Sequence, residues 1–140
     1  MKKYEMCLDS LDSLNINQKF KDAILQTLDR ICSLNFSEIK EVYLFGSLSK
    51  KTETALSDID LLVVTNEAIT DRYRRSEITC LMDGINTFKF DIVVYSEEQL
   101  ITGCSMFMQD INSSKLLLMK EVTIECVKFT NTLTRVPIIR

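Results

Sequence analysis

The stretches Leu44-Phe45-Gly46-Ser47 and Ser57-Asp58-Ile59-Asp60-Leu61 decide how the rest of the chain is interpreted. The first stretch ends a short apolar run, so we expect a strand over 41–45 that is followed by a turn. Gly46 lets a ligand approach the backbone closely, and Ser47 offers a hydroxyl and an amide hydrogen to a phosphate. A helix beginning at this turn would add the favourable dipole of its N-terminus. The first stretch therefore predicts a phosphate-binding turn.

The second stretch places two carboxylates at the start of a strand that we expect over 59–64. Side chains alternate along a strand, so Asp58 and Asp60 are expected to lie on the same face. Adjacent carboxylates repel each other unless a cation lies between them, and Mg²⁺ commonly takes one or two carboxylates together with water and phosphate oxygens. Asp91 offers a third carboxylate on a later strand. We therefore predict a magnesium site at one edge of the sheet, where a carboxylate also draws the proton from an attacking hydroxyl.

Each of these features also has an ordinary structural interpretation. A Gly-Ser pair after a strand is usually a simple turn, and an Asp-x-Asp pair is usually a solvated sheet edge. Here the Gly-Ser turn, the Asp-x-Asp strand and a later Phe-Asp-Ile-Val-Val strand occur in one short chain. Together they favour a site for phosphoryl or nucleotidyl transfer.

Composition limits the possible chemistry. The chain has 140 residues, a formal net charge of −3, five cysteines and no histidine. The acidic balance argues against binding of duplex nucleic acid, and the lack of histidine removes Ser-His nucleophiles and histidine-based zinc sites. The cysteines are odd in number and form no C-x-x-C pair, so we expect reduced thiols and a cytoplasmic location. No apolar run is long enough for a signal peptide or a membrane span.

Residue periodicity predicts an α/β domain with one small mixed sheet flanked by helices. Apolar residues spaced by three and four predict helices over 17–34 and 70–85. Period-two alternation predicts a strand over 87–95, with Lys89 and Asp91 on the face opposite the aromatic residues. The run Ser96-Glu97-Glu98-Gln99 resembles a capping box that opens a short helix. Further expected elements are a short helix over 106–111 and strands over 116–119 and 122–129.

The length fits a single domain over 1–140, with 1–16 and 130–140 as peripheral segments. The stretch from Met1 to Asn17 is mixed in character, and we expect it to be frayed or loosely helical. The apolar run Val136-Pro137-Ile138-Ile139 fits a docking segment and a frayed end equally well.

These motifs resemble the nucleotidyltransferases of the DNA polymerase β superfamily, and more narrowly the minimal nucleotidyltransferases of bacteria and archaea. The match is specific over 44–64, good over 91–94 and weak over 107–118. The resemblance implies a polymerase β palm-like fold, two Mg²⁺ ions, and ATP or another NTP as co-substrate. It implies that Asp58, Asp60 and Asp91 bind the metal ions and that Asp91 is also the catalytic base. It places the nucleotide against Gly46, Ser47, Lys50, Lys51 and Ser57.

The sequence departs from the family pattern beside the Gly-Ser turn. Relatives often carry an arginine directly after the serine and a glycine four positions after it, where this chain has Leu48 and Lys51. Lys50 matches a basic position of the family. We expect Leu48 to weaken phosphate binding and Lys51 to restore part of it.

The resemblance suggests an enzyme that transfers AMP from ATP to a hydroxyl of a partner protein, because the chain is too short to carry a large acceptor-binding domain. Minimal family members are commonly paired with a small helical HEPN-type protein, and some act as antitoxins by adenylylating it. Two alternatives stay open, namely transfer to a small molecule such as an aminoglycoside and a catalytically inactive partner-binding module. An oligomer is compatible with the sequence.

Two further clusters have competing interpretations. Arg72, Arg74 and Arg75 fit a solvated helix face better than a contact for a partner or acceptor. The run Met106-Phe107-Met108 fits core packing better than a binding surface.

Overall fold

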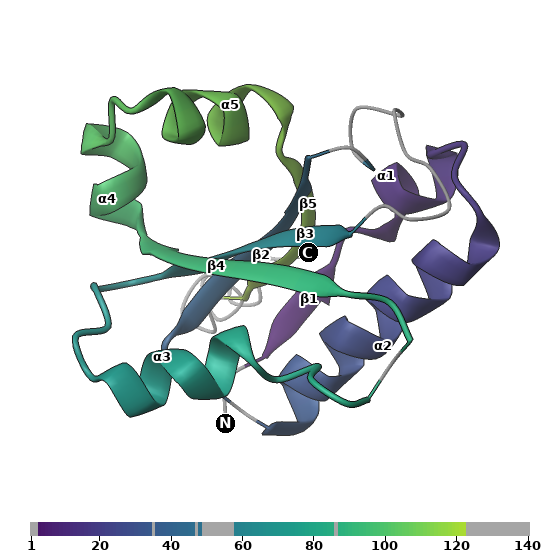
Figure 1. Ribbon diagram of the computed structural model, residues 1–140, viewed down its shortest axis with the longest axis horizontal. Helices are drawn as coiled ribbons and strands as arrows, with labels where there is room; N and C mark the ends of the chain where they lie inside the picture. Colours follow the sequence, from purple (N-terminus) through teal and green to yellow (C-terminus); the bar gives the residue numbers. More distant parts are fainter. Residues whose placement is uncertain (1–2, 35, 47, 49–57, 86, 123–140) are drawn as a thin grey trace, which may run out of the picture.

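The computed structural model describes residues 3–34, 36–46, 48, 58–85 and 87–122. Within these residues five strands form one mixed sheet in the order β1-β5-β2-β3-β4 (Figure 1). The strands are β1 (Tyr4–Met6), β2 (Ile39–Phe45), β3 (Ile59–Thr65), β4 (Phe90–Ser96) and β5 (Leu116–Glu121). The helices are α1 (Leu8–Ser13), α2 (Gln18–Leu34), α3 (Arg72–Thr79), α4 (Glu97–Thr102) and α5 (Met106–Ser114). The predicted α/β class with a small mixed sheet is confirmed.

Strand pairing brings the start of β3 and β4 next to the end of β2. β3 and β4 are parallel, whereas β2 pairs antiparallel with β3 and with β5. Asp60 lies opposite Phe45 of β2 on one side and opposite Asp91 of β4 on the other. We call this end of the sheet the site end. The predicted meeting of Asp60 and Asp91 at one edge follows from this register.

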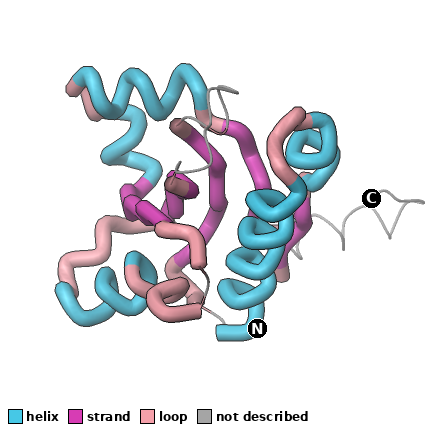
Figure 2. The backbone as a smooth tube through the Cα atoms, turned by 45° about the vertical axis from the view of Figure 1, so that its right-hand side comes forward, coloured by secondary structure: helices cyan, strands magenta, loops and turns pink. Residues whose placement is uncertain are grey.

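The sheet is covered on both faces, which explains why β3 is apolar on both of its sides. Ile59, Leu61 and Val63 pack in a core with α1, α2 and α3. Leu62 and Val64 pack in a second core with Leu100 of α4 and residues of α5. Figures 1 and 2 show the sheet between these two helical layers. Because side chains alternate along a strand, Asp60 and Asp91 belong to the face that α4 and α5 cover.

Helix α2 follows its predicted range closely. Asn17 precedes its first residue, and the Asn17 side chain accepts a hydrogen bond from the Lys19 backbone N–H at 2.9 Å. This is the local capping that asparagine supplies at helix starts. The apolar stripe is buried up to Ile31, with Ile24 and Ile31 fully inaccessible to solvent, but Leu34 at its end is 46% exposed.

Helix α3 ends earlier than predicted. It stops at Thr79, and the chain continues through turns to Gly84, which has a φ of 74°. The predicted apolar face holds for Ile78, Leu81 and Met82, but Ile85 is 44% exposed. The apolar periodicity of 78–85 therefore arises from turns packed on the sheet and not from a continued helix.

The expectation of a frayed or loosely helical N-terminal segment holds for one short helix and misses one strand. Tyr4 to Met6 form β1, which pairs antiparallel with β5, and Leu8–Ser13 form α1. The Tyr4 hydroxyl donates to the Ile39 carbonyl at 2.8 Å, and Leu11 is only 1% exposed. A three-residue edge strand is too short to show a period of two, so tertiary contacts and not local pattern fix this segment.

β4 begins at Phe90, three residues later than predicted, and the other described elements agree with prediction. Ser96 and Gln99 form the expected capping box at α4, and α5 and β5 cover the ranges predicted for a helix and a strand. The strand predicted over 122–129 and the apolar tail lie outside the described residues, except for Val122 itself. The four described cysteines are free thiols, as expected. No helix in the described part of the chain combines the length and apolar character needed to cross a membrane.

Candidate active site

Two carboxylates face each other across β3 and β4 at the site end. Asp60 is partly buried, and Asp91, its register partner, is exposed. Burial raises the pKa of Asp60 to about 6, and the charges of Asp91 and Asp58 push it in the same direction. Like charges opposite each other in a sheet are destabilising, so this pair favours a bound cation.

Asp58 lies one residue before β3 and completes the acidic group. Its Oδ2 atom is 3.9 Å from the Nζ atom of Lys89, which lies one residue before β4. The backbone N–H of Ile59 donates to the Lys89 carbonyl at 2.9 Å, and this bond fixes the two strand starts beside each other. Asp58 is thus held next to Asp60 and next to a cationic side chain.

Gly46 provides the space in which the Asp60 carboxylate lies. It follows Phe45, which is the partner of Asp60 on β2, and its φ is 77°. A Cβ atom added at Gly46 would overlap Asp60 Oδ2 and come within 2.9 Å of Asp60 Cγ. Only glycine therefore allows the β2 turn to approach this carboxylate so closely.

The start of α5 packs beside the same site. The ring of Phe107 meets the ring of Phe45 edge-on, with centroids 6.2 Å apart. Met108 is buried, as predicted, but Met106 is 86% exposed and Phe107 is 47% exposed. Ile101 of α4 is 83% exposed. The prediction of core packing for 106–108 is therefore wrong for Met106, because the helix turns that side chain away from the sheet. We call Ile101, Met106 and Phe107 the α4–α5 patch.

The oxygen donors at the site end fit Mg²⁺. Among the described residues, no three Asp, Glu, Cys or His side chains are gathered closely enough to hold a metal ion by themselves. Mg²⁺ does not need such a cage, since it usually combines one or two carboxylates with water and substrate phosphates. Burial, together with the charges of Asp91 and Asp58, raises the pKa of Asp60, and a divalent cation beside these carboxylates would favour the charged form.

Four residues expected at the nucleotide, Ser47, Lys50, Lys51 and Ser57, lie outside the described residues. The structure does describe Leu48, and its side chain is fully buried in the core that α1, α2 and α3 form with the sheet. The apolar residue where relatives often have arginine therefore serves packing. Sequence reasoning did not single out Lys89, although the alternation that placed Asp91 also placed Lys89 on the same face.

The arginines of α3 have structural partners. Arg74 forms an ion pair with Glu38, including an Nη2–Oε1 hydrogen bond of 2.7 Å, and its guanidinium lies 4.7 Å from the centroid of the Phe36 ring. The Arg74 side chain lowers the pKa of Glu38 by hydrogen bonding. Arg75 donates to the Val94 carbonyl at 3.3 Å. Arg74 thus fastens α3 to the segment that precedes β2, and Arg75 fastens it to β4. Arg72 is exposed, so the solvated interpretation holds for this arginine alone.

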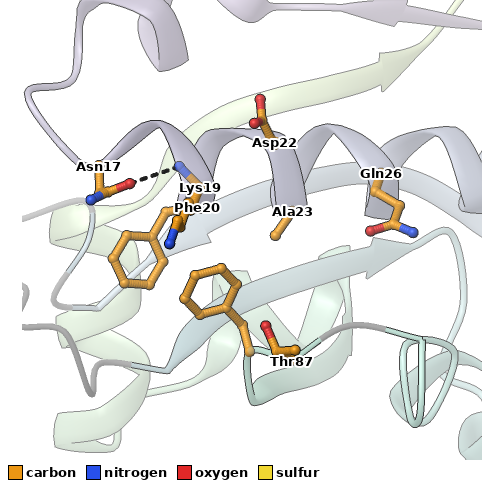
Figure 3. Close-up of a pocket in the computed structure, with 8 residues that line it drawn as sticks. Asn17, Lys19, Phe20, Asp22, Ala23, Gln26 and Thr87 are labelled. Carbon is orange, nitrogen blue, oxygen red and sulfur yellow. Dashed lines mark hydrogen bonds between the residues drawn. The ribbon is translucent and has the colours of Figure 1, made fainter.

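A groove of about 600 Å³ lies on the other side of the sheet, between α2 and the Thr87–Phe88 segment. Phe20 lines the groove together with Thr87 (Figure 3). The Phe20 ring packs against the ring of Phe88, with centroids 4.6 Å apart. Lys19, Asp22 and Gln26 of α2 line its rim. Phe88 belongs to the core of the α2 face, so the groove is separate from the carboxylates on the α4–α5 face.

A family model described as polymerase β, nucleotidyltransferase, matches residues 26–122. The chain belongs to this nucleotidyltransferase family. The matched range includes β2, β3 and β4, and with them Gly46, Asp58, Asp60 and Asp91. The predicted membership of the polymerase β superfamily and its fold are confirmed. No curated protein matches the chain.

Solved structures with a similar fold include a protein assigned as a nucleotidyltransferase and two toxin–antitoxin complexes. A protein from Sulfolobus solfataricus assigned as a nucleotidyltransferase is 19% identical, with 74% of this chain and 88% of that chain covered and a TM-score of 0.46. The MntA–HepT toxin–antitoxin complex is 20% identical, with coverages of 72% and 70% and a TM-score of 0.45. The complex of tri-AMPylated Shewanella oneidensis HEPN toxin with MNT antitoxin is 19% identical, with coverages of 73% and 71% and a TM-score of 0.41.

Proposed function

We propose that this nucleotidyltransferase transfers AMP from ATP, in the presence of Mg²⁺, to a hydroxyl group of a partner protein. The observation that carries the proposal is the register that sets Asp60 opposite Asp91, with Gly46 against the Asp60 carboxylate. A clustered, partly buried pair of acids without a cation destabilises a fold. Retention of the pair together with Asp58 therefore favours catalysis over a catalytically inactive binding module.

Each acidic residue has a role in the proposed reaction. Asp58 and Asp60 hold the metal ions, and Asp91 contributes a ligand and accepts the proton of the attacking hydroxyl. Mg²⁺ supplies neutralisation of the triphosphate charge. The hydroxyl oxygen forms a bond to the α-phosphorus of ATP, the bond from that phosphorus to the bridging oxygen breaks, and pyrophosphate leaves. Exposure of Asp91 suits a base that must meet a hydroxyl brought by another molecule.

The α4–α5 patch supports a protein as the acceptor. It borders the site through the contact of Phe107 with Phe45, and Phe45 is the register partner of Asp60. Exposed apolar side chains beside a catalytic site indicate a surface that another protein covers. By the resemblance of the motifs to minimal nucleotidyltransferases, the expected partner is a small helical HEPN-type protein.

A labelling experiment tests the proposed reaction. With ATP labelled at the α-phosphate and Mg²⁺, we expect the intact chain to label a protein that co-purifies with it or is encoded beside it. The double variant Asp58→Asn with Asp60→Asn removes two metal ligands, so labelling should fall to the background without enzyme. Absence of label on this chain, on the partner and on any lysate protein would exclude the proposed activity. Label found only on a small molecule would favour the aminoglycoside-type alternative.

Changing Met106 to aspartate tests the role of the α4–α5 patch. A charge placed in an apolar interface should lower partner labelling by about tenfold or more. Binding of ATP with Mg²⁺, measured by calorimetry, should stay unchanged, since Met106 is 86% exposed and points away from the core. Tyr73→Asp is the matched control, because Tyr73 is an equally exposed apolar residue on α3. Equal effects of the two variants on labelling would contradict a docking role for the patch.

A further inference from the structure

Lys89 and Asp58 extend the pairing of the catalytic carboxylates by one more row. Ile59 is the register partner of Phe90, and Asp58 and Lys89 directly precede these two residues. The hydrogen bond from the Ile59 N–H to the Lys89 carbonyl continues the ladder to this position. The site end thus holds an inner row of two acids, Asp60 and Asp91, and an outer row of one acid and one ammonium group.

The two rows differ in their charge balance. The inner row joins like charges, because Asp60 and Asp91 are register partners on neighbouring strands. The outer row joins opposite charges, with Lys89 Nζ 3.9 Å from Asp58 Oδ2. Opposite charges across neighbouring strands stabilise a sheet, whereas like charges destabilise it. Lys89 therefore partly neutralises the acidic group when no metal is bound.

The contact between Lys89 and Asp58 is weak enough for the Lys89 side chain to move to another partner. The Lys89 side chain is 78% exposed and that of Asp58 is 41% exposed, so water screens the pair and its strength is small. A lysine ammonium on a flexible stem has no fixed donor geometry and can move to another oxygen at little cost. Asp58 is also a proposed metal ligand, so a divalent cation would take the place of the ammonium group beside it.

We propose that Lys89 is a nucleotide-binding residue that alternates between two partners at the active site. It holds Asp58 when the site is free of metal, and it contacts a triphosphate oxygen when the nucleotide and Mg²⁺ are bound. This inference rests on the proposed function for the identity of the nucleotide. Lys89, directly before β4, supplies positive charge to the triphosphate in addition to the lysines expected beside the Gly-Ser turn.

Replacing Lys89 by methionine tests both partners. The Lys89 charge should favour binding of ATP with Mg²⁺ but oppose binding of Mg²⁺ alone. Affinity for ATP with Mg²⁺ should fall about five- to tenfold, as expected for loss of one partly exposed charge contact. Affinity for Mg²⁺ without nucleotide should rise about two- to threefold, since the competing ammonium group is gone. Isothermal titration calorimetry on the full chain measures both constants and needs no acceptor. Lys89→Arg, which keeps the charge, should restore most of the ATP affinity.

The matched control is Lys120→Met. Lys120 forms a comparable exposed pair with Glu5, with Nζ and Oε1 3.5 Å apart, at the opposite end of β5 from the site end. This variant should leave both affinities unchanged. Weakening of both affinities by Lys89→Met, or an unchanged ATP affinity, would overturn the inference. Failure of the intact chain to bind ATP with Mg²⁺ would instead overturn the proposed function.

Discussion

Replacing Asp60 by asparagine is expected to abolish AMP transfer and, at the same time, to stabilise the metal-free protein at neutral pH. Transfer should be lost because Asp60 is the partly buried carboxylate of the pair with Asp91 and a proposed metal ligand. Stability should rise because the variant removes a negative charge that burial, Asp91 and Asp58 all disfavour. Opposite signs for activity and stability are characteristic of a residue kept for function.

The pH dependence of this effect follows from the pKa of Asp60. Its folded value of about 6 lies above the ordinary value of 3.8, so the folded state holds the proton to a higher pH than the unfolded state. The free energy of unfolding therefore falls as pH rises from about 4 to about 6, and the loss is fully present at pH 7. A shift of about two pH units corresponds to at most about 3 kcal/mol, and screening at this partly accessible site reduces it to about 1–3 kcal/mol.

Urea unfolding without divalent cations, at pH 5 and at pH 7.5, measures this contribution. The intact chain should lose stability between the two pH values, and Asp60→Asn should lose less. Asp12→Asn, at an exposed position on α1, is the control for removal of a carboxylate as such. Mg²⁺ affinity of the intact chain should also fall below about pH 6, where protons compete for Asp60. A variant less stable than the intact chain at pH 7.5 would show that the Asp60 charge supports the fold.

Much of the site could be predicted because its acids lie in strongly patterned strands. β3 is apolar on both sides apart from Asp60 and its last residue Thr65, and such a strand is recognisable as the buried centre of a sheet. The alternation of β4 likewise placed Asp91 on one face. That Asp60 and Asp91 are direct register partners depends on β3 and β4 being parallel neighbours. This pairing is a long-range property, so local pattern could suggest it but not establish it.

Other features depended on contacts that the sequence does not display. β1 forms because it pairs with β5 and because the Tyr4 hydroxyl donates a hydrogen bond to the Ile39 carbonyl. Its three residues are too few to show a strand pattern. Leu48 departs from the family pattern beside the predicted phosphate-binding turn, yet it is fully buried. Met106 is apolar but exposed, because α5 has room for only one face on the sheet. In these three cases tertiary packing determined whether a strand formed or a side chain was buried, and the local sequence did not predict it.

Replacing Gly46 by alanine is expected to weaken binding of ATP with Mg²⁺ about 10- to 100-fold, the range observed when a neighbour that orients a metal ligand is changed. The added Cβ would collide with the Oδ2, Cγ and Cβ atoms of Asp60, so the whole carboxylate must turn away from its place opposite Asp91. The positive φ of 77° adds a conformational cost of about 1 kcal/mol for any residue other than glycine.

Gly84→Ala separates the effect of the collision with Asp60 from the conformational cost of a positive φ. Gly84 has a nearly equal φ of 74°, but no atom lies within 4 Å of the position that its Cβ would take. Both variants should therefore lose about 1 kcal/mol of folding stability, whereas only Gly46→Ala should lose affinity for ATP with Mg²⁺. Thermal unfolding and calorimetry of the two variants measure the two effects separately. Equal nucleotide affinities would mean that Gly46 serves only the turn. A selective loss at Gly46 would show that the close approach of the β2 turn to the Asp60 carboxylate is required for nucleotide binding.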